Sequence, residues 1–294
     1  MGNVRTFLIN WALARQSGWK IIMRIEDLDR TRVRPGAAER LLDDLAWLGI
    51  DFDQGPLYQS HDLEPYCTAM RRLCDLRMAY RCDLSRKQIQ SAASAPHADS
   101  GEQRFGPDLR PCNEEMFSFG KVDSNYRLRV EPREMMIYDQ LAGNSRHDPF
   151  NEVGDFLIWT KLGVPAYQLA VVVDDARQGV TDVVRGDDLL PSAARQELEY
   201  RALGLPVPRW WHVPLVLTDD GRRLAKRDDD AHLDRCRAAG VSPQRIVGLL
   251  ASWCCVCEQP REMTSDEFLG LFDIGRVPKS HVAFTAANRA WLES

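Results

Sequence analysis

Two charged residues lie at the ends of short apolar runs. Their side chains have the chemistry to hold the ammonium and carboxylate groups of an amino acid. Glu26 comes directly after the run 20–25, and Arg185 closes the run 183–185. Ligands of open parallel sheets bind beyond the carboxyl ends of the strands. A carboxylate there can bind an ammonium group, and an arginine can hold a carboxylate through two parallel hydrogen bonds. Tyr167 precedes a neighbouring apolar run, so we expect its side chain to face the same cleft.

A second group of residues has the chemistry of a nucleotide site. Gly2 and Asn3 open a predicted helix, whose free backbone N–H groups and positive dipole end favour a phosphate. The segment 220–227 combines a glycine turn with several cations, Lys226 among them. Such a loop can neutralise a triphosphate in a transition state.

Each pattern also has a purely structural interpretation. The stretch 24–32 fits a solvated charge run after a strand, and Arg185 fits an ion pair with Asp187 or Asp188. The start of the first helix fits an ordinary cap, and the segment 220–227 fits an exposed basic loop. The local sequence leaves these alternatives open.

The elements that must position these residues alternate between helix and strand. Apolar periodicity predicts helices over 3–17, 36–48 and 62–79, with a buried strand over 20–25. This alternation predicts an α/β fold with a doubly wound parallel sheet. The segment 91–111 is rich in Ser, Ala, Pro, Asp and Gly and predicts little regular structure.

The rest of the chain is expected to return to the sheet and then to become helical. Alternation over 126–145 predicts a pair of strands, and the segment 192–203 predicts a helix. From residue 240 onward the pattern predicts helices only. The predicted core strands cover 155–160, 167–175 and 213–217.

Composition indicates an ordinary globular protein. The 294 residues are 44% hydrophobic and 28% charged, with a net charge of −5, which argues against a general polyanion-binding protein. The chain has no apolar run of about 18 residues and no signal-peptide pattern, so we expect no membrane partner and a cytoplasmic location. The eight cysteines lack paired CxxC spacing, so we expect reduced, buried thiols.

Four segments, in this order, resemble the class I aminoacyl-tRNA synthetases of the glutamyl group. The segments are 2–11, 24–32, 167–195 and 212–227. The resemblance covers essentially the whole chain. It is nearest to a short branch of the family that lacks an anticodon-binding domain, and the length of the chain fits that branch.

The resemblance implies an ATP-dependent ligase. L-glutamate and ATP, with Mg²⁺, would form glutamyl-adenylate and pyrophosphate. The glutamyl group would then pass to the queuosine base in the anticodon loop of tRNA(Asp). We expect a monomer with a class I synthetase Rossmann-like sheet, an inserted α+β module and a C-terminal helical region. The implied parts are two halves of the nucleotide-binding domain at 1–79 and 155–217, the inserted acceptor-type module at 80–154, and the signature loop with the helical region at 218–294.

The resemblance also implies roles for single residues. Glu26 would hold the α-ammonium of glutamate, and Arg185, helped by Tyr167, would pair with a carboxylate of glutamate. The catalytic cation of the signature loop, which stabilises the transition state of adenylation, would be Lys226. The implied ATP-binding residues are Gly2, Asn3 and Lys226.

The chain departs from the family pattern at its start and in the signature loop. Family members begin with a strand and loop that carry an arginine, a small hydroxyl residue and the first signature histidine, and we expect this chain to lack them. We therefore expect weakened folding and adenylation. The loop has Arg223 and Ala225 where the family favours Lys and Ser, but it keeps the cation at 226.

A third departure concerns zinc. Many family members hold zinc in the insert through a Cys-x-Cys pair and a later Tyr and Cys. Cys82 remains here, but Leu84, Phe105 and Leu109 occupy the other positions. One ligand cannot form a tetrahedral site, so we expect no zinc and an apolar cluster in its place.

Two further functions stay open on the sequence alone. The chain could charge ordinary glutamyl-tRNA without an anticodon domain, or it could be a non-catalytic, decayed paralogue. A Rossmann-type dehydrogenase is disfavoured, because no GxGxxG follows a strand. The basic candidates for contact with a tRNA stem are Arg5, Arg201, Arg209 and Arg276.

Overall fold

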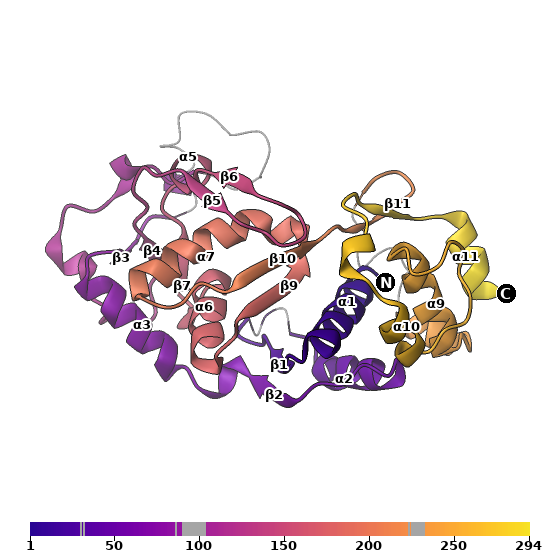
Figure 1. The fold of residues 1–294 in the computed structure, drawn as a ribbon. Helices are drawn as coiled ribbons and strands as arrows, with labels where there is room; N and C mark the ends of the chain where they lie inside the picture. The colour runs from indigo at the N-terminus through magenta and orange to yellow at the C-terminus, as the bar shows by residue number, and fades with distance from the viewer. Residues whose placement is uncertain (30, 32, 86, 90–103, 223, 225–232) are drawn as a thin grey trace.

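The computed structural model describes residues 1–294 except 30, 32, 86, 90–103, 223 and 225–232 (Figure 1). The α-helices are α1 Gly2–Ser17, α2 Ala37–Trp47, α3 Glu64–Asp75, α5 Pro149–Glu152, α6 Tyr167–Gln178, α7 Leu190–Leu203, α8 Leu233–Ala238, α9 Pro243–Trp253, α10 Ser265–Leu271 and α11 Ala286–Glu293. The strands are β1 Ile22–Ile25, β2 Gln54–Tyr58, β3 Ala79–Arg81, β4 Tyr126–Leu128, β5 Met135–Ile137, β6 Ser145–His147, β7 Leu157–Thr160, β8 Val164–Pro165, β9 Asp182–Gly186, β10 Arg209–Val213, β11 Val216–Thr218 and β12 Val282–Phe284. Short 3₁₀ helices are η1 Gln59–His61, η2 Pro107–Leu109, η3 Glu114–Phe117, η4 Asp187–Leu189 and η6 Ile274–Arg276.

The molecule has two lobes, joined where the chain runs from β10 to β11 (Figure 1). One lobe contains α3, α6, α7 and the short antiparallel strands, and the other contains the C-terminal helices α9 to α11. The helix α1 lies at the junction and packs against both β9 and α10. Each lobe has its own hydrophobic cluster. Leu8 of α1 packs with Leu250 and Phe268 in one cluster, and Leu73, Leu169 and Ala193 pack together in the other.

Two parallel strand pairs carry the elements of the predicted sheet. β1 pairs with β2 and β9 pairs with β10, each through a helical crossover, α2 or α7. In the second pair Arg185 stands directly beside His212. The two pairs are separate ladders, because no strand among the described residues bonds to both β1 and β9.

The strand predicted over 167–175 is wrong, because this segment forms the helix α6. Every residue from Gln168 to Asp175 is buried, and Gly179 ends the helix in the left-handed conformation. A helix that is buried on all sides shows the same continuous apolar run as a buried strand, so periodicity alone could not separate the two.

The strand pair predicted over 126–145 is also wrong as a pair. β4 lies between β3 and β7 in a four-stranded antiparallel sheet that ends with β8, whereas β5 pairs with β6. The strand predicted over 155–160 is confirmed as β7. It joins this antiparallel sheet, and the sheet therefore spans the predicted domain boundary after residue 154.

The C-terminal part is not purely helical as predicted. β12 pairs in parallel with β11 and ties the end of the chain to the segment that follows the second parallel pair. The cysteines are free, but burial holds for only some of them: Cys112 and Cys255 are exposed. Within the described part of the chain, no helix combines the length and apolar character needed to cross a membrane.

The apolar cluster predicted in the insert is confirmed. Cys82 and Phe105 are buried together with Tyr80, and Leu84 and Leu109 pack against them. The guanidinium of Arg127 lies 4.0 Å from the Phe105 ring centroid. The metal content itself stays a prediction.

Candidate active site

Glu26, Tyr167 and Arg185 come from three elements and lie at one site. Glu26 follows β1, Tyr167 is the first residue of α6, and Arg185 lies in β9. Loss of solvation raises the pKa of the Tyr167 phenol; the Arg185 guanidinium opposes this rise and the Glu26 carboxylate adds to it. Charges shift a pKa in this way only over short distances. Solvent still reaches the site, because 40% of Tyr167 is exposed.

Arg24 anchors β1 to α6 beside this site. Its guanidinium donates to Asp175 at 2.7 Å and to Gln178 at 2.9 Å, and it lies 3.6 Å from Glu26. Loss of solvation raises the pKa of Glu26, and the Arg24 charge opposes that rise. The Glu26 side chain is nevertheless 44% exposed, so the alternative of a solvated charge run after β1 stays open.

Arg185 is held on three sides by neutral groups. Its Nε donates to Nε2 of His212 at 3.0 Å, one Nη to Gln196 at 2.8 Å, and the other Nη to the Leu189 carbonyl at 3.3 Å. Its guanidinium also lies 4.8 Å from the ring centroid of Trp210.

The alternative that Arg185 serves an ion pair with Asp187 or Asp188 is wrong. No carboxylate in the described part of the chain lies within ion-pair distance of Arg185, and the ion-pair partner of Asp187 is His281 at 3.6 Å. Loss of solvation lowers the pKa of Arg185, and Tyr167 partly offsets this. A partly desolvated guanidinium without a carboxylate is suited to bind an anionic group from a ligand.

His212 and Asp139 support this arginine, and sequence reasoning missed both roles. His212 Nδ1 lies 2.6 Å from Asp139 Oδ2, and both side chains are fully buried. Asp139 also accepts from the backbone N–H groups of Leu141 and Ala142. His212 lies in a segment that sequence patterns single out, whereas Asp139 comes from a distant loop after β5 and carries no local signal.

The predicted nucleotide residues lie at the start of α1. The helix begins at Gly2 with no side-chain cap, and Asn3 is exposed. A Cβ on Gly2 would meet Val216 of β11 at 3.7 Å, so the helix start adjoins the strand that leads into the signature loop. Lys226, Arg223 and Ala225 lie outside the described residues. The turn before them is formed by Thr218, whose hydroxyl donates to Asp220 and accepts from the backbone N–H of Arg222.

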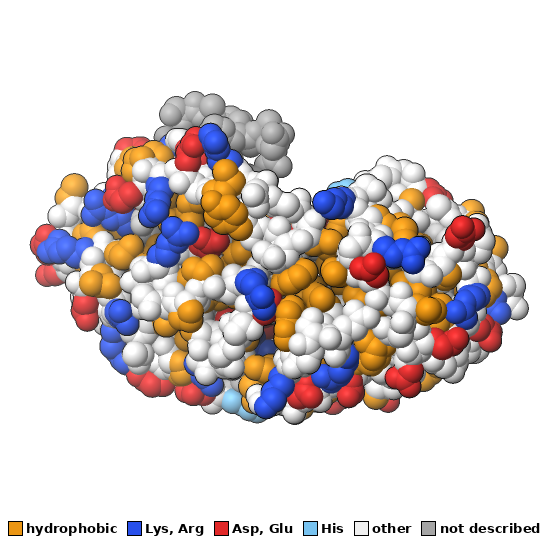
Figure 2. Space-filling view, viewed as in Figure 1, with side chains coloured by type: hydrophobic (Ala, Val, Ile, Leu, Met, Phe, Trp, Pro, Cys, Tyr) orange, Lys and Arg blue, Asp and Glu red, His pale blue; other side chains and the backbone are white. Residues whose placement is uncertain are grey.

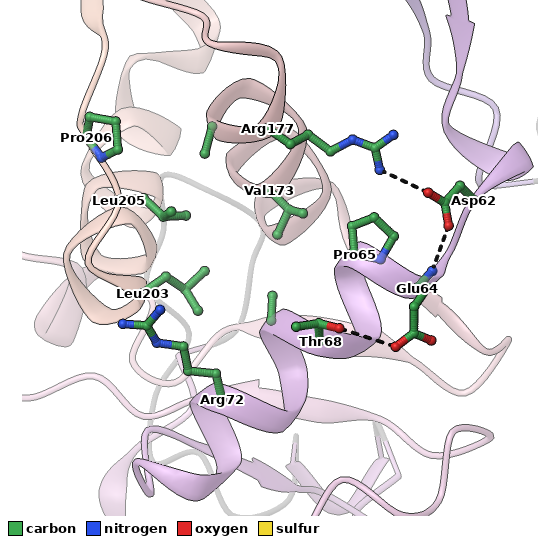
Figure 3. Close-up of a pocket in the computed structure, with 12 residues that line it drawn as sticks. Asp62, Glu64, Pro65, Thr68, Arg72, Val173, Arg177, Leu203, Leu205 and Pro206 are labelled. Carbon is green, nitrogen blue, oxygen red and sulfur yellow. Dashed lines mark hydrogen bonds and ion pairs between the residues drawn. The ribbon is translucent and has the colours of Figure 1, made fainter.

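A groove of about 570 Å³ lies between α3, α6 and α7 (Figure 3). Val173, Leu203 and Pro206 form part of its apolar lining, and Arg177 points across to Asp62 at one end. None of the predicted site residues lines it. The groove is therefore separate from the Arg185 site.

The basic candidates for a tRNA contact are mostly engaged within the protein. Arg5 is buried and donates to the carbonyls of Pro214 and Trp253, so its assignment is wrong. Arg201 pairs with Glu197, and Arg209 pairs with Asp182. Basic and acidic side chains are mixed over the face shown in Figure 2, and hydrophobic side chains gather near the junction of the lobes.

Comparison with known proteins identifies the family of this chain. The family described as tRNA synthetases class I (E and Q), catalytic domain, matches residues 1–291. A glutamyl-Q tRNA(Asp) synthetase of Symbiobacterium thermophilum is 42% identical over 99% of this chain and 94% of its own length. One from Nocardia farcinica is 43% identical over 95% of this chain and 87% of its own length.

The fold agrees with this match. The solved glutamate-tRNA synthetase of Elizabethkingia anophelis superposes with a TM-score of 0.83 at 23% identity, over 99% of this chain and 66% of that chain. The class I α/β fold expected from the sequence is thereby confirmed. The chain belongs to the class I tRNA synthetases of the glutamate and glutamine group.

Proposed function

We propose that this chain activates L-glutamate with ATP and transfers the glutamyl group to the queuosine base in the anticodon loop of tRNA(Asp). One observation carries the proposal. The Arg185 guanidinium has no carboxylate partner among the described residues and lies near Tyr167, while the acidic Glu26 lies at the same site. A ligand with both a carboxylate and an ammonium group fits this pair of opposite charges.

The chemistry consists of two transfers. A carboxylate oxygen of glutamate attacks the α-phosphorus of ATP, the bond to pyrophosphate breaks, and glutamyl-adenylate forms. The acceptor on the tRNA then attacks the activated carbonyl and releases AMP. The site contributes mainly position and charge: Glu26 holds the ammonium group, and Arg185 with Tyr167 holds a carboxylate.

The nucleotide is assigned to the start of α1, where Gly2 and Asn3 present backbone N–H groups. Lys226 supplies the cation that stabilises charge on the phosphates during adenylation. The described residues contain no cluster of three or more His, Cys, Asp or Glu side chains that could hold a metal. Mg²⁺ would accompany ATP, since this ion usually binds through substrate phosphates, and would help to neutralise their charge.

Sequence identity favours the queuosine branch over ordinary charging. The chain is 42% identical to the Symbiobacterium glutamyl-Q tRNA(Asp) synthetase but 33% identical to a glutamate–tRNA ligase of Synechococcus. We further propose that the protein is cytoplasmic and monomeric. Size-exclusion chromatography with light scattering tests the monomeric state.

The test uses two assays on the purified chain. Glutamate-dependent exchange of pyrophosphate into ATP measures activation, and radiolabelled glutamate measures transfer to tRNA(Asp) with queuosine, to tRNA(Asp) without it, and to tRNA(Glu). Transfer only to the queuosine-containing tRNA supports the proposal. Transfer to tRNA(Glu) would support the charging enzyme instead, and absence of any exchange would support the decayed paralogue.

A further inference from the structure

Three side chains from separate parts of the chain form one hydrogen-bonded line that ends at the amino-acid site. Asp139 follows β5, His212 lies in β10, and Arg185 lies opposite His212 in the register of β9. The distances along the line are 2.6 Å from Asp139 Oδ2 to His212 Nδ1 and 3.0 Å from His212 Nε2 to Arg185 Nε. Asp139 and His212 are closed off from solvent.

The proton positions along this line follow from the partners. An arginine Nε–H can only donate, so His212 Nε2 must accept and must carry no proton. His212 Nδ1 therefore carries the proton and donates it to Asp139. Asp139 accepts further bonds from the backbone N–H groups of Leu141, Ala142 and His212, which favours its ionised form.

This arrangement leaves part of Arg185 available for a ligand. The guanidinium has five N–H donors, and its three bonds to His212, Gln196 and Leu189 use one donor on each nitrogen. The other two N–H groups lie one on each Nη, where Tyr167 also forms a hydrogen bond with the guanidinium. A carboxylate can engage such a pair of Nη donors in place of or beside the phenol. Because His212 holds Nε, the plane of the guanidinium is fixed before the ligand arrives.

The line of hydrogen bonds also links Arg185 to the buried carboxylate of Asp139 through His212. A neutral His212 separates Asp139 from Arg185, so Asp139 can orient the line without occupying the donors that face the site, and the carboxylate whose charge acts on Arg185 is Asp175. A direct ion pair would block those donors. We propose that Asp139 and His212 are positioning residues that hold Arg185 for the carboxylate of glutamate; this rests on the proposed function of Arg185.

The test measures binding of L-glutamate by isothermal titration calorimetry to the full chain and its variants. Asp139→Asn and His212→Ala are expected to weaken glutamate binding about 10- to 100-fold, as for loss of a hydrogen bond to a charged group. Their affinity for ATP is expected to be unchanged. His212→Gln is expected to regain most of the affinity, because its amide can accept from Arg185 and donate to Asp139.

Asp155→Asn is the matched control, since Asp155 is a buried aspartate that shares no partner with Arg185. If this variant does not fold, Tyr80→Phe removes one bond from the same aspartate. The control is expected to bind glutamate as the wild type does. Equal glutamate affinity in wild type, Asp139→Asn and His212→Ala would overturn the proposal.

A second measurement separates this proposal from the proposed function. The ¹⁵N chemical shifts of the His212 ring at pH 7.5 report which nitrogen carries the proton. The Nδ1–H form in the wild type is expected whether or not glutamate binds. The Nε2–H or the charged form in the wild type would overturn the line of bonds. Absence of glutamate binding in a wild type that shows the Nδ1–H form would instead refute the proposed function of Arg185.

Discussion

Asp139 and Asp155 are both buried aspartates, but they serve different ends. Asp155 accepts from the Tyr80 hydroxyl at 2.5 Å, from Arg110 at 2.8 and 2.9 Å, and from the backbone N–H of Val130 at 2.8 Å. These partners lie in the insert, and their bonds fasten it to the start of the segment 155–217. The bonds of Asp139 lead through His212 to Arg185, whose remaining donors face an accessible site.

The difference shows how to tell a structural network from a functional one. Around Asp155 the charge of Arg110 is met directly by the carboxylate and by the Val130 carbonyl. Around Asp139 the guanidinium of Arg185 meets only neutral groups and the Tyr167 phenol, with no carboxylate within ion-pair distance in the described structure. A desolvated guanidinium without a carboxylate, next to a solvent-accessible site, therefore points to an anionic ligand.

A third buried acid, Glu199 in α7, belongs to neither class. It is fully buried, and neither carboxylate oxygen has a hydrogen-bond partner in the described structure. Burial raises the pKa of Glu199 well above its ordinary value, and the attraction of Arg195 opposes this only in part. Glu199 therefore lowers the stability of the fold, and no contact in the described structure compensates for this.

The largest expected effect concerns the functional network. Arg185→Ala should lower kcat/KM for glutamate in pyrophosphate exchange by roughly 10²- to 10³-fold, because it removes the cation assigned to bind a carboxylate of glutamate. The melting temperature should change little. Wild-type exchange in this variant would remove Arg185 from the site.

The structural network should give the opposite pattern. Asp155→Asn should lower the free energy of unfolding by about 3 kcal/mol, because the largely buried Arg110 loses its nearest counter-charge and keeps only the exposed Glu131 at 3.4 Å. Glutamate affinity, measured while the variant is folded, should stay as in the wild type. Urea unfolding provides the first quantity, and a selective loss of glutamate binding would make Asp155 part of the site.

Replacement of Glu199 by Leu should stabilise the fold by about 1–3 kcal/mol at pH 8. The folded-state pKa of Glu199 is raised, so its penalty is absent below the unfolded-state pKa of about 4.3 and grows as the pH rises above it. The gain from Glu199→Leu should accordingly shrink toward pH 4. Urea unfolding at several pH values checks this, and a gain independent of pH would contradict the assignment.

The smallest expected effect is that of metal removal on the insert. The positions of the family's zinc ligands are packed as an apolar cluster around Phe105. A chelator should therefore leave the melting temperature unchanged, and elemental analysis should find no stoichiometric zinc. One zinc per chain would show that the cluster does not replace the metal.

The sequence alone predicted which charged groups form the site, but not the residues Asp139 and His212 that hold Arg185 in place. Glu26 and Arg185 were identified because strand ends in parallel sheets are ligand sites, and the structure brings them together with Tyr167. Leu84, Phe105 and Leu109 were apolar where ligands were expected, which predicted the cluster. The sequence failed to predict α6 as a helix and β12 as a strand for the same reason. Local periodicity does not identify the packing partner of a short or fully buried element.

The residue types and their order determined the family, the class of fold and the charges offered to an amino acid. The tertiary structure decided which of those charges are available to a ligand. Asp139 and His212 are 73 residues apart, and their bond depends on how the insert packs against β10. Such a contact has no local signature, because side chains distant in sequence meet only after the core has formed.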